Sequence, residues 1–197
     1  MRVTTHFLLW ALKLARAETQ TSEAERATLA RHAAEKKRLV EIGVWHGVTT
    51  KLLRNAMAPD GLLLGIDPYP KGRFGFSVQR VIAQREIARA TVGTMEWQRL
   101  TGVEAARLYA ASKRPPVDFI FIDGDHSYEG LQGDWEAWSP LVAPQGIIAL
   151  HDSCSSADRN IEGAGSVIFT RESILPDPRF RLVESVDTLT IMSRCSD

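Results

Sequence analysis

Acidic side chains and a histidine follow directly after two apolar runs of the chain. Asp123 comes after VDFIFI (117–122), and His151 and Asp152 come after IIAL (147–150). If these runs are neighbouring strands, the carboxylates lie close together and repel each other unless a cation or a proton sits between them. Oxygen ligands with open water positions suit Mg²⁺, which can neutralise a hydroxyl as it ionises. The alternative is a pair of structural carboxylates that cap helices.

A candidate general base stands three residues after Asp123. Histidine titrates near neutral pH, so a neutral His126 beside a cation can take the proton of an alcohol. Asp125 is the second candidate, and a helix-capping role is the alternative for both residues. The remaining histidines have no comparable neighbours and are expected to be solvated or structural: His6, His32 and His46.

A glycine-containing turn follows an earlier apolar run. The segment EIGVWHGVT (41–49) places Gly43 and Gly47 four residues apart, where backbone can approach a ligand closely. The helix expected after the turn offers unpaired N–H groups to an anion. The pattern is not the GxGxxG of dinucleotide binding, so it implies no pyrophosphate site. A tight strand-to-helix turn without a ligand is the alternative.

Asp67 ends the next apolar run, LLLGI (62–66). An acidic side chain at this position can accept hydrogen bonds from both hydroxyls of a ribose. An aspartate before Pro68 also commonly begins a turn, which is the alternative. The separation of about 20 residues from the glycine turn matches a ribose-binding acid and favours that function.

Short apolar runs and helical stretches alternate from residue 38 onward. Strands are expected at 38–44, 62–66, 96–100, 117–122 and 147–150, with helices at 48–57, 75–90, 103–112 and 128–138. Continuous aliphatic strands separated by helices indicate a parallel sheet that is covered on both faces. The tail differs, because 179–186 and 188–194 have the spacing of an antiparallel hairpin. The expected fold class is therefore α/β, with a mostly parallel sheet and a C-terminal hairpin.

The first 37 residues are predicted to be a helical segment attached to a single domain of residues 38–197. Phe7, Trp10, Ala11 and Leu14 share one helical face, which either packs on the chain's own core or forms a homodimer interface. After a polar break, Ser22 and Glu25 form a capping box that begins a second helix.

Composition limits the partners and the compartment. Twenty-four basic residues balance 24 acidic ones, so no overall positive field favours nucleic acid. No apolar run is long enough to span a membrane, and Lys13 interrupts the run FLLWALKL (7–14), which argues against a signal peptide. The two cysteines have no ligand-like spacing and are expected to be free thiols. We expect a cytoplasmic protein with neither membrane nor nucleic-acid partners.

The run from Arg38 to Asp152 resembles the class I S-adenosylmethionine-dependent methyltransferases. The residues that carry this resemblance are IDGDHSYEG (122–130) with Asp134 and Trp138 beyond it, the PQG turn (144–146) and His151-Asp152. They are most similar to small-molecule O-methyltransferases of the macrocin, mycinamicin and novobiocin type, which act on sugars. The resemblance implies a Rossmann-like seven-stranded sheet in the order 3-2-1-4-5-7-6, with helices on both faces.

The resemblance also implies which residues contact S-adenosylmethionine. Gly43 and Gly47 would line its methionine part, with Glu41 facing the amino group and Thr49 donating to the carboxylate. Asp67 would hold the ribose. The remaining contacts would come from Gly102 and Val103, which border the adenine, and from Trp45, which packs either over the cofactor or into the core.

Related enzymes hold a metal at the positions of Asp123, His151 and Asp152. The expected ion is Mg²⁺; because histidine is a softer ligand, Mn²⁺ or Zn²⁺ also suits the set, or His151 simply orients Asp152. Mycinamicin-type relatives place the base at the position of His126, and novobiocin-type relatives place it at that of Asp125.

The sequence therefore predicts a metal-assisted O-methyltransferase that acts on a hydroxyl of a sugar or another small natural product. Two alternatives stay open. One is metal-independent transfer to a phenol or an amine, and the other is a cofactor-binding subunit without activity of its own.

Overall fold

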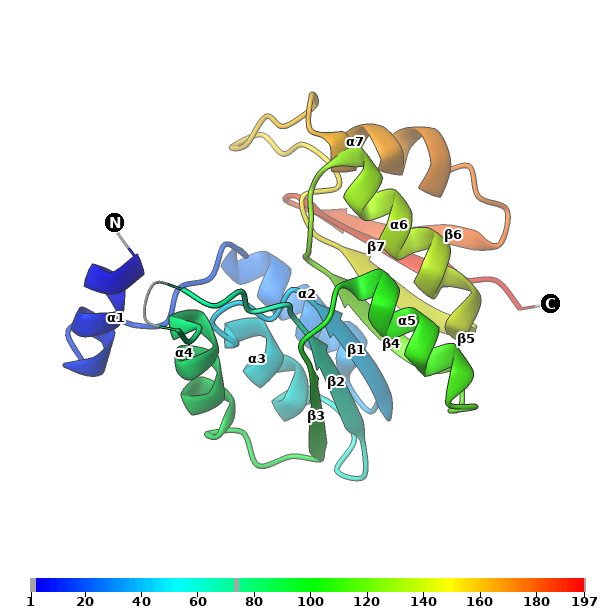
Figure 1. Ribbon diagram of the computed structural model, residues 1–197. Coiled ribbons are helices and arrows are strands. Elements are labelled where there is room, and N and C mark those ends of the chain that lie inside the picture. The colour runs from blue at the N-terminus through cyan, green and yellow to red at the C-terminus, as the bar shows by residue number, and fades with distance from the viewer. Residues whose placement is uncertain (1–2, 73–74, 197) are drawn as a thin grey trace.

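A single seven-stranded sheet organises the computed structural model, which describes residues 3–72 and 75–196 (Figure 1). The strand order is β3-β2-β1-β4-β5-β7-β6. β1 to β5 are parallel, and the last two strands form an antiparallel hairpin along β5. The strands are β1 (Arg38–Ile42), β2 (Leu62–Ile66), β3 (Thr94–Gln98), β4 (Val117–Ile122), β5 (Val142–Leu150), β6 (Phe180–Val186) and β7 (Leu189–Arg194). The predicted α/β fold and its strand order are confirmed.

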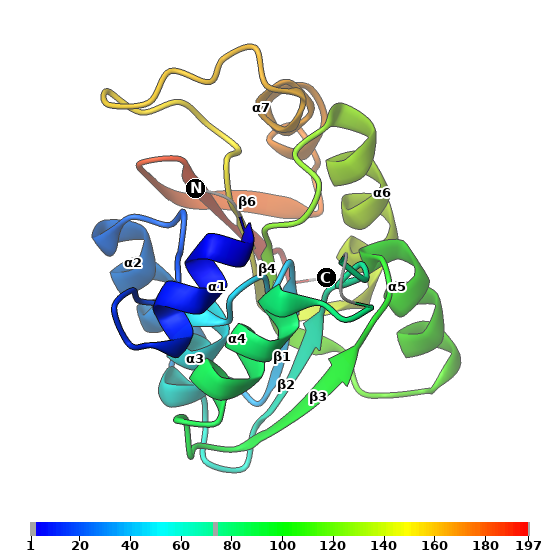
Figure 2. The same ribbon diagram turned by 60° about the vertical axis from the view of Figure 1, so that its left-hand side comes forward.

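Helices cover both faces of the sheet (Figures 1 and 2). They are α1 (Val3–Ala11), α2 (Glu23–Ala33), α3 (Val48–Ala56), α4 (Val78–Ile87), α5 (Gly102–Ala111), α6 (Tyr128–Trp138) and α7 (Gly165–Phe169). Because side chains alternate along a strand, Val40 and Ile42 of β1 pack toward α5 and α6, whereas Leu39 packs toward α2 and α3. Within the described residues, none of the helices combines the length and the apolar character needed to cross a membrane.

Several element bounds differ from the predicted ones for local reasons. β1 ends at Ile42 rather than Val44, because Gly43 adopts a φ of +93° that a strand cannot continue through. α4 begins at Val78 rather than residue 75, because the Ser77 hydroxyl accepts from the Arg80 N–H and caps the helix there. β5 begins at residue 142, five residues earlier than expected. The short α7 lies in a stretch where no element was predicted.

The N-terminal segment packs on the sheet domain through α1 and α2. Trp10 of α1 is buried with Val78 and Ile82 of α4, so the apolar face of α1 has a partner in its own chain. Leu8, Leu12 and Leu14 remain exposed. The predicted capping box is confirmed at the start of α2. A homodimer through this segment stays a prediction, and residues 1, 2 and 197 of the predicted domain division lie outside the described residues.

Glu25 of α2 joins the N-terminal segment to the hairpin and to the end of β5. Its Oε1 accepts from the backbone N–H of Thr188 at 2.9 Å and from the Thr188 hydroxyl at 2.7 Å. Its Oε2 accepts from the Ser22 N–H at 2.7 Å and lies 3.6 Å from Nε2 of His151. Burial alone would raise the pKa of Glu25, but the contacts with His151, Ser22 and Thr188 outweigh it and lower the pKa to about 2.

We predict that Glu25→Gln lowers the free energy of unfolding at pH 7 by about 3 kcal/mol, the equivalent of moving a pKa from 4.5 to about 2. A depressed folded-state pKa stabilises the protein above the unfolded-state value, and this stabilisation is lost as the pH falls through the folded-state value. The difference between wild type and variant should therefore shrink between about pH 4.5 and 2. Urea unfolding across this range measures it. Glu23→Gln, at an exposed position of the same helix, is the control, and an equal loss in both variants would contradict the prediction.

Candidate active site

A cavity of about 730 Å³ opens at the carboxyl ends of β1, β2 and β4. The strand order reverses between β1 and β4, and open α/β sheets bind ligands at this switch point. Its walls are the turn after β1, the ends of β2 and β4, the start of α5, one side of α6 and residues Glu18, Thr19 and Gln20 of the N-terminal segment. The volume lies within the range of about 300–1,000 Å³ that is typical of small-molecule sites.

The turn after β1 is held in shape by the groups around it. An added Cβ on Gly43 would lie 1.9 Å from the carbonyl oxygen of Asp123, so only glycine allows this turn to pack on the end of β4. Gly47, with a φ of +76°, packs against Ile87 of α4 in the same way. Both glycines line the cavity as predicted, but the close approach that requires them is to the chain's own backbone and side chains.

Asp67 links the turn to the end of β2. Its Oδ2 accepts from the N–H of Trp45 at 2.9 Å, and its Oδ1 accepts from the N–H of Tyr69 at 2.8 Å. The Tyr69 hydroxyl donates to the carbonyl of Trp45, which has a φ of +47°. Burial raises the pKa of Asp67, while these N–H groups lower it in part. Each carboxylate oxygen keeps a lone pair toward the cavity, so the ribose-binding function stays a prediction with a suitable acceptor.

Glu41 and Thr49 are arranged differently from the prediction. Glu41 is fully buried beneath the turn and does not line the cavity, because its side chain points to the face of β1 that α2 and α3 cover. The Thr49 hydroxyl donates to Oε1 of Glu41 at 2.6 Å. Burial raises the pKa of Glu41 to about 8, so the group is protonated at neutral pH. The expected donation from Thr49 to a cofactor carboxylate would have to replace this internal bond.

Gly102 and Val103 line the opposite wall together with Asp134 of α6. The carboxylate of Asp134 packs on Gly102, where an added Cβ would lie 2.0 Å from Oδ1. Burial, and in second place the charge of Asp125, raise the pKa of Asp134 to about 6. No function was predicted for Asp134 from the sequence. Its position in the sequence could have indicated a function, because Asp134 is an acid on the helix face that buries Leu131 and Trp138.

The described residues that line the cavity include several carboxylates and neither lysine nor arginine. The acids are Glu18, Asp67, Asp123, Asp125, Glu129 and Asp134. A cavity lined by one sign of charge concentrates ligands of the opposite sign. It therefore favours a cationic ligand over a phosphate-bearing one.

His126 stands at the end of β4, next to Asp123. Its Nε2 lies 3.5 Å from Oδ1 of Asp123, and its backbone carbonyl accepts from the Ser166 N–H at 3.0 Å. Asp125 instead accepts from the N–H of Ser127 at 2.9 Å, at the start of α6. The histidine side chain is about one-third exposed, and His126 lines the cavity. Both candidate bases line the cavity, and in His126 the side chain makes no hydrogen bond within the described residues, whereas Asp125 accepts one from the start of α6.

His151 occupies a position between two carboxylates. Its Nδ1 donates to Oδ1 of Asp123 at 2.8 Å, and its Nε2 lies 3.6 Å from Oε2 of Glu25. The side chain is fully buried, which by itself lowers its pKa. The two carboxylates outweigh burial and raise the pKa to about 10, so the imidazole carries a proton on both nitrogens at neutral pH.

Asp152 is paired with a residue that the sequence analysis did not consider. Arg159 donates to Oδ1 and Oδ2 of Asp152 at 2.5 and 2.9 Å in a two-pronged ion pair. Asp152 also lies 4.0 Å from Nε2 of His126. The predicted ligand set of Asp123, His151 and Asp152 does meet at one edge of the sheet. As arranged, Asp123 accepts from Nδ1 of His151 and both oxygens of Asp152 accept from Arg159, so a divalent cation would have to displace the His151 proton and compete with Arg159.

Residues 40–153, more than half of the chain, match the methyltransferase domain family. The chain belongs to this family. The uncharacterized protein y4gI of Sinorhizobium fredii is 27% identical over 130 residues, which are 62% of this chain and 14% of that protein. The methyltransferase described here therefore spans about one-seventh of the length of that relative.

Solved O-methyltransferases share the fold of this methyltransferase. TomG from Streptomyces achromogenes, involved in tomaymycin synthesis and solved in complex with S-adenosylmethionine, is 16% identical with a TM-score of 0.69, covering 98% of this chain and 89% of TomG. An O-methyltransferase from Bacillus cereus, in complex with S-adenosylhomocysteine, is 19% identical with a TM-score of 0.65, covering 100% of this chain and 91% of its own.

We predict that Asp67→Ala weakens the binding of S-adenosylhomocysteine to this methyltransferase by about 1–3 kcal/mol, the usual worth of hydrogen bonds to a charged group. Titration calorimetry measures it. Asp60→Ala, which removes an exposed acid at the opposite end of β2, is the matched control. Equal affinity in wild type and Asp67→Ala would remove Asp67 from the binding site.

Proposed function

We propose that this methyltransferase transfers the methyl group of S-adenosylmethionine to a hydroxyl of a small molecule. The observation that carries the proposal is the acid-lined cavity at the switch point, with His126 at its catalytic end. S-adenosylmethionine bears a sulfonium and an ammonium group against one carboxylate, so it is a net cation. A cavity rich in carboxylates attracts such a cofactor and repels nucleotides with a pyrophosphate.

In the proposed orientation, each part of the cofactor contacts a different wall of the cavity. Its ribose would lie on Asp67, its methionine part along the turn at Gly43 and Gly47, and its adenine against the wall that Gly102 and Asp134 form together. The adenine edge offers a donor at its exocyclic amine and an acceptor at N1. A carboxyl group whose pKa is raised to about 6 is readily protonated and then matches both atoms.

We predict that Asp134→Ala weakens S-adenosylhomocysteine binding at least tenfold, whereas Asp134→Asn retains most of the affinity. An asparagine amide presents both a donor and an acceptor, like the protonated acid, and alanine presents neither. Calorimetry on the two variants measures this difference. Equal weakening by both substitutions would show that Asp134 holds the cavity wall through its charge and does not contact the base.

The proposed reaction is an in-line displacement. The acceptor oxygen forms a bond to the methyl carbon as the carbon–sulfur bond breaks, and the electron pair of that bond stays on sulfur to give neutral S-adenosylhomocysteine. The hydroxyl proton passes to His126, and Asp123 at 3.5 Å stabilises the imidazolium that forms. The protein supplies position and deprotonation.

The acceptor is proposed to be a polyol such as a sugar. The exposed acids Asp125 and Glu129 stand beside His126 at the cavity rim, and carboxylates accept hydrogen bonds from several hydroxyls at once. A phenol or an amine is the competing class of acceptor. Screening glycosides, phenols and amines with labelled cofactor separates these classes.

Metal assistance is the second form of this proposal. It is favoured by the donor atoms of Asp123, His126 and His151, which lie within 4.8 Å of one another. Mg²⁺, Mn²⁺ or Zn²⁺ at this edge would require His151 to lose a proton, or Asp152 to leave Arg159. The direct transfer of the proton to His126 needs no such rearrangement, and we therefore favour it.

We predict that His126→Ala binds S-adenosylhomocysteine normally but loses about 10²–10⁴-fold in turnover, the usual worth of a general base. The ascending limb of the wild-type pH–rate profile should be absent from the variant. His32→Ala, which removes a histidine that is paired with Glu184 and does not line the cavity, is the control.

The same assay decides the role of the metal. Direct transfer predicts undiminished turnover after exhaustive chelation, whereas lost turnover that returns with added Mg²⁺ would establish the metal-assisted form. A fully active His126→Ala enzyme would overturn the assignment of the base. Normal cofactor binding without turnover on any acceptor would favour a non-catalytic cofactor-binding subunit.

A further inference from the structure

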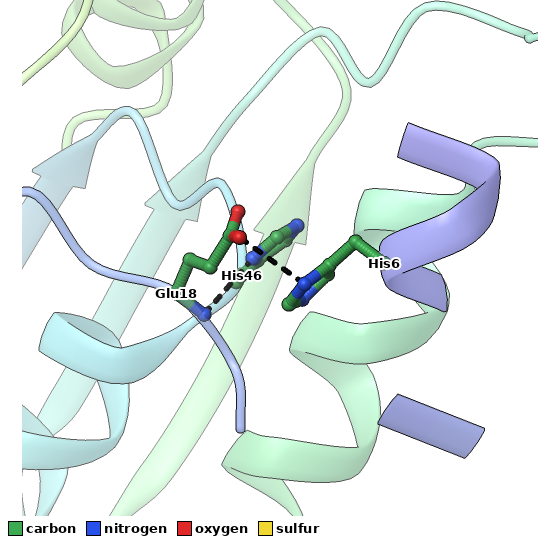
Figure 3. Close-up of side chains that lie close together, drawn as sticks. All are labelled: His6, Glu18 and His46. Carbon is green, nitrogen blue, oxygen red and sulfur yellow. Dashed lines mark hydrogen bonds and ion pairs between the residues drawn. The ribbon is translucent and has the colours of Figure 1, made fainter. Parts of the chain in front are cut away.

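A second group of metal-ligating side chains lies outside the catalytic edge, where α1 meets the turn after β1 (Figure 3). It consists of His6 from α1, Glu18 from the segment between α1 and α2, and His46 from the turn. One ligand atom from each residue lies within 4.8 Å of the other two. Both histidines are at least 96% buried, whereas the Glu18 side chain is 45% exposed. The group is therefore closed toward the protein and open toward solvent on one side.

The hydrogen-bonding groups of this cluster are poorly satisfied. Nδ1 of His6 lies 3.1 Å from Oε1 of Glu18, but the contact lacks hydrogen-bond geometry. Neither ring nitrogen of His6 has a hydrogen-bond partner among the described residues, although both are buried. An unsatisfied buried polar atom typically costs about 1–3 kcal/mol. A ligand bound to Nδ1 of His6 would satisfy one of these two atoms.

The ligand must be a cation that accepts lone pairs from nitrogen. The rings of His6 and His46 stack at 5.2 Å with an angle of 6° between their planes, an arrangement that disfavours two protonated rings. Nδ1 of His46 accepts from the N–H of Glu18 at 3.2 Å, so this nitrogen carries a lone pair directed toward Glu18. Nδ1 of His6 also faces Glu18, as Figure 3 shows.

We propose that His6, Glu18 and His46 form a zinc site. Two imidazoles and one carboxylate are a common ligand set for Zn²⁺, with a water as the fourth ligand on the exposed side of Glu18. The ligand atoms already lie within 4.8 Å of one another, and binding through Nδ1 of His46 would displace the 3.2 Å bond that this atom accepts from the Glu18 N–H. Glu18 lies in an irregular segment between two helices, so it can make this adjustment without disturbing a strand.

The site would fasten the N-terminal segment to the cavity. Glu18, Thr19 and Gln20 form part of the cavity wall, and His46 stacks on Trp45 at 4.4 Å in the turn beside the proposed cofactor. Zinc would therefore tie α1 and the following segment to the turn that shapes the methionine end of the site. It shares no residue with the catalytic edge at Asp123.

The test measures metal content and affinity in the full-length protein. Elemental analysis and calorimetry with Zn²⁺ should show one equivalent in wild type, and Co²⁺ should give visible absorption bands of nitrogen and oxygen ligation. His6→Gln and Glu18→Gln should each weaken binding more than about 100-fold, since even partners of metal ligands are worth about 10–100-fold. His32→Gln and Asp123→Asn are the controls and should keep both the equivalent and the bands.

Glu18→Gln is expected to leave the fold intact, because it is a near-isosteric change of a partly exposed side chain, so lost binding in this variant reports the lost ligand. Hydrogen exchange should also show that Zn²⁺ protects residues 5–20 in wild type and not in Glu18→Gln. Retention of the metal in both ligand variants, or its loss in Asp123→Asn, would overturn the proposal. So would a folded wild-type protein that binds no Zn²⁺ at micromolar concentrations, in which case the cluster is only an ion pair between His6 and Glu18.

Discussion

The imidazolium of His151 holds together the parts of this methyltransferase that meet at the end of β5. It lies buried between Asp123 of the catalytic edge and Glu25 of the N-terminal segment. Each carboxylate would be costly to bury alone, and a buried charge that loses its partner typically destabilises a protein by about 3–5 kcal/mol. Glu25 in turn holds Thr188 between the two strands of the hairpin. One imidazolium therefore faces both carboxylates at the contact through which α2, the hairpin and the catalytic edge are joined.

This arrangement determines which group at the catalytic edge is free to react. His151 satisfies Asp123, and Arg159 satisfies Asp152, so neither carboxylate needs a further cation in the described structure. His126 lies next to these pairs and lines the cavity. The residues predicted to be metal ligands therefore form two ion pairs, Asp123 with His151 and Asp152 with Arg159, and His126 lies beside them.

The central strands were predicted closely because β2 and β4 are almost continuous apolar runs, a pattern that is visible locally in the sequence. β2 and β4 have the expected bounds, and the order of the strands follows from the family resemblance. The partners of the site residues could not be predicted, because they come from far along the chain. Glu25 lies more than 120 residues from His151, and the loop that carries Arg159 has no periodic pattern. Glu41 was misplaced for a different reason. Its neighbours in the sequence line the cavity, but the alternation of side chains along β1 turns it into the opposite face.

The negative charge of the cavity affects how readily the proposed product leaves as well as how tightly the proposed cofactor binds. S-adenosylmethionine loses its sulfonium charge during transfer, whereas the acids at Asp67, Asp123 and Asp134 remain in the walls. Interactions that act on the sulfonium are lost at that moment, so S-adenosylhomocysteine is held by its ribose, adenine and amino-acid contacts only. The raised pKa of Asp67 and Asp134 shows that burial disfavours their charged forms when no cation is near. A cationic cofactor offsets that penalty and a neutral product does not. The proposed function therefore implies that the acid-lined wall favours the cofactor over the product by charge, although the two differ by a single methyl group.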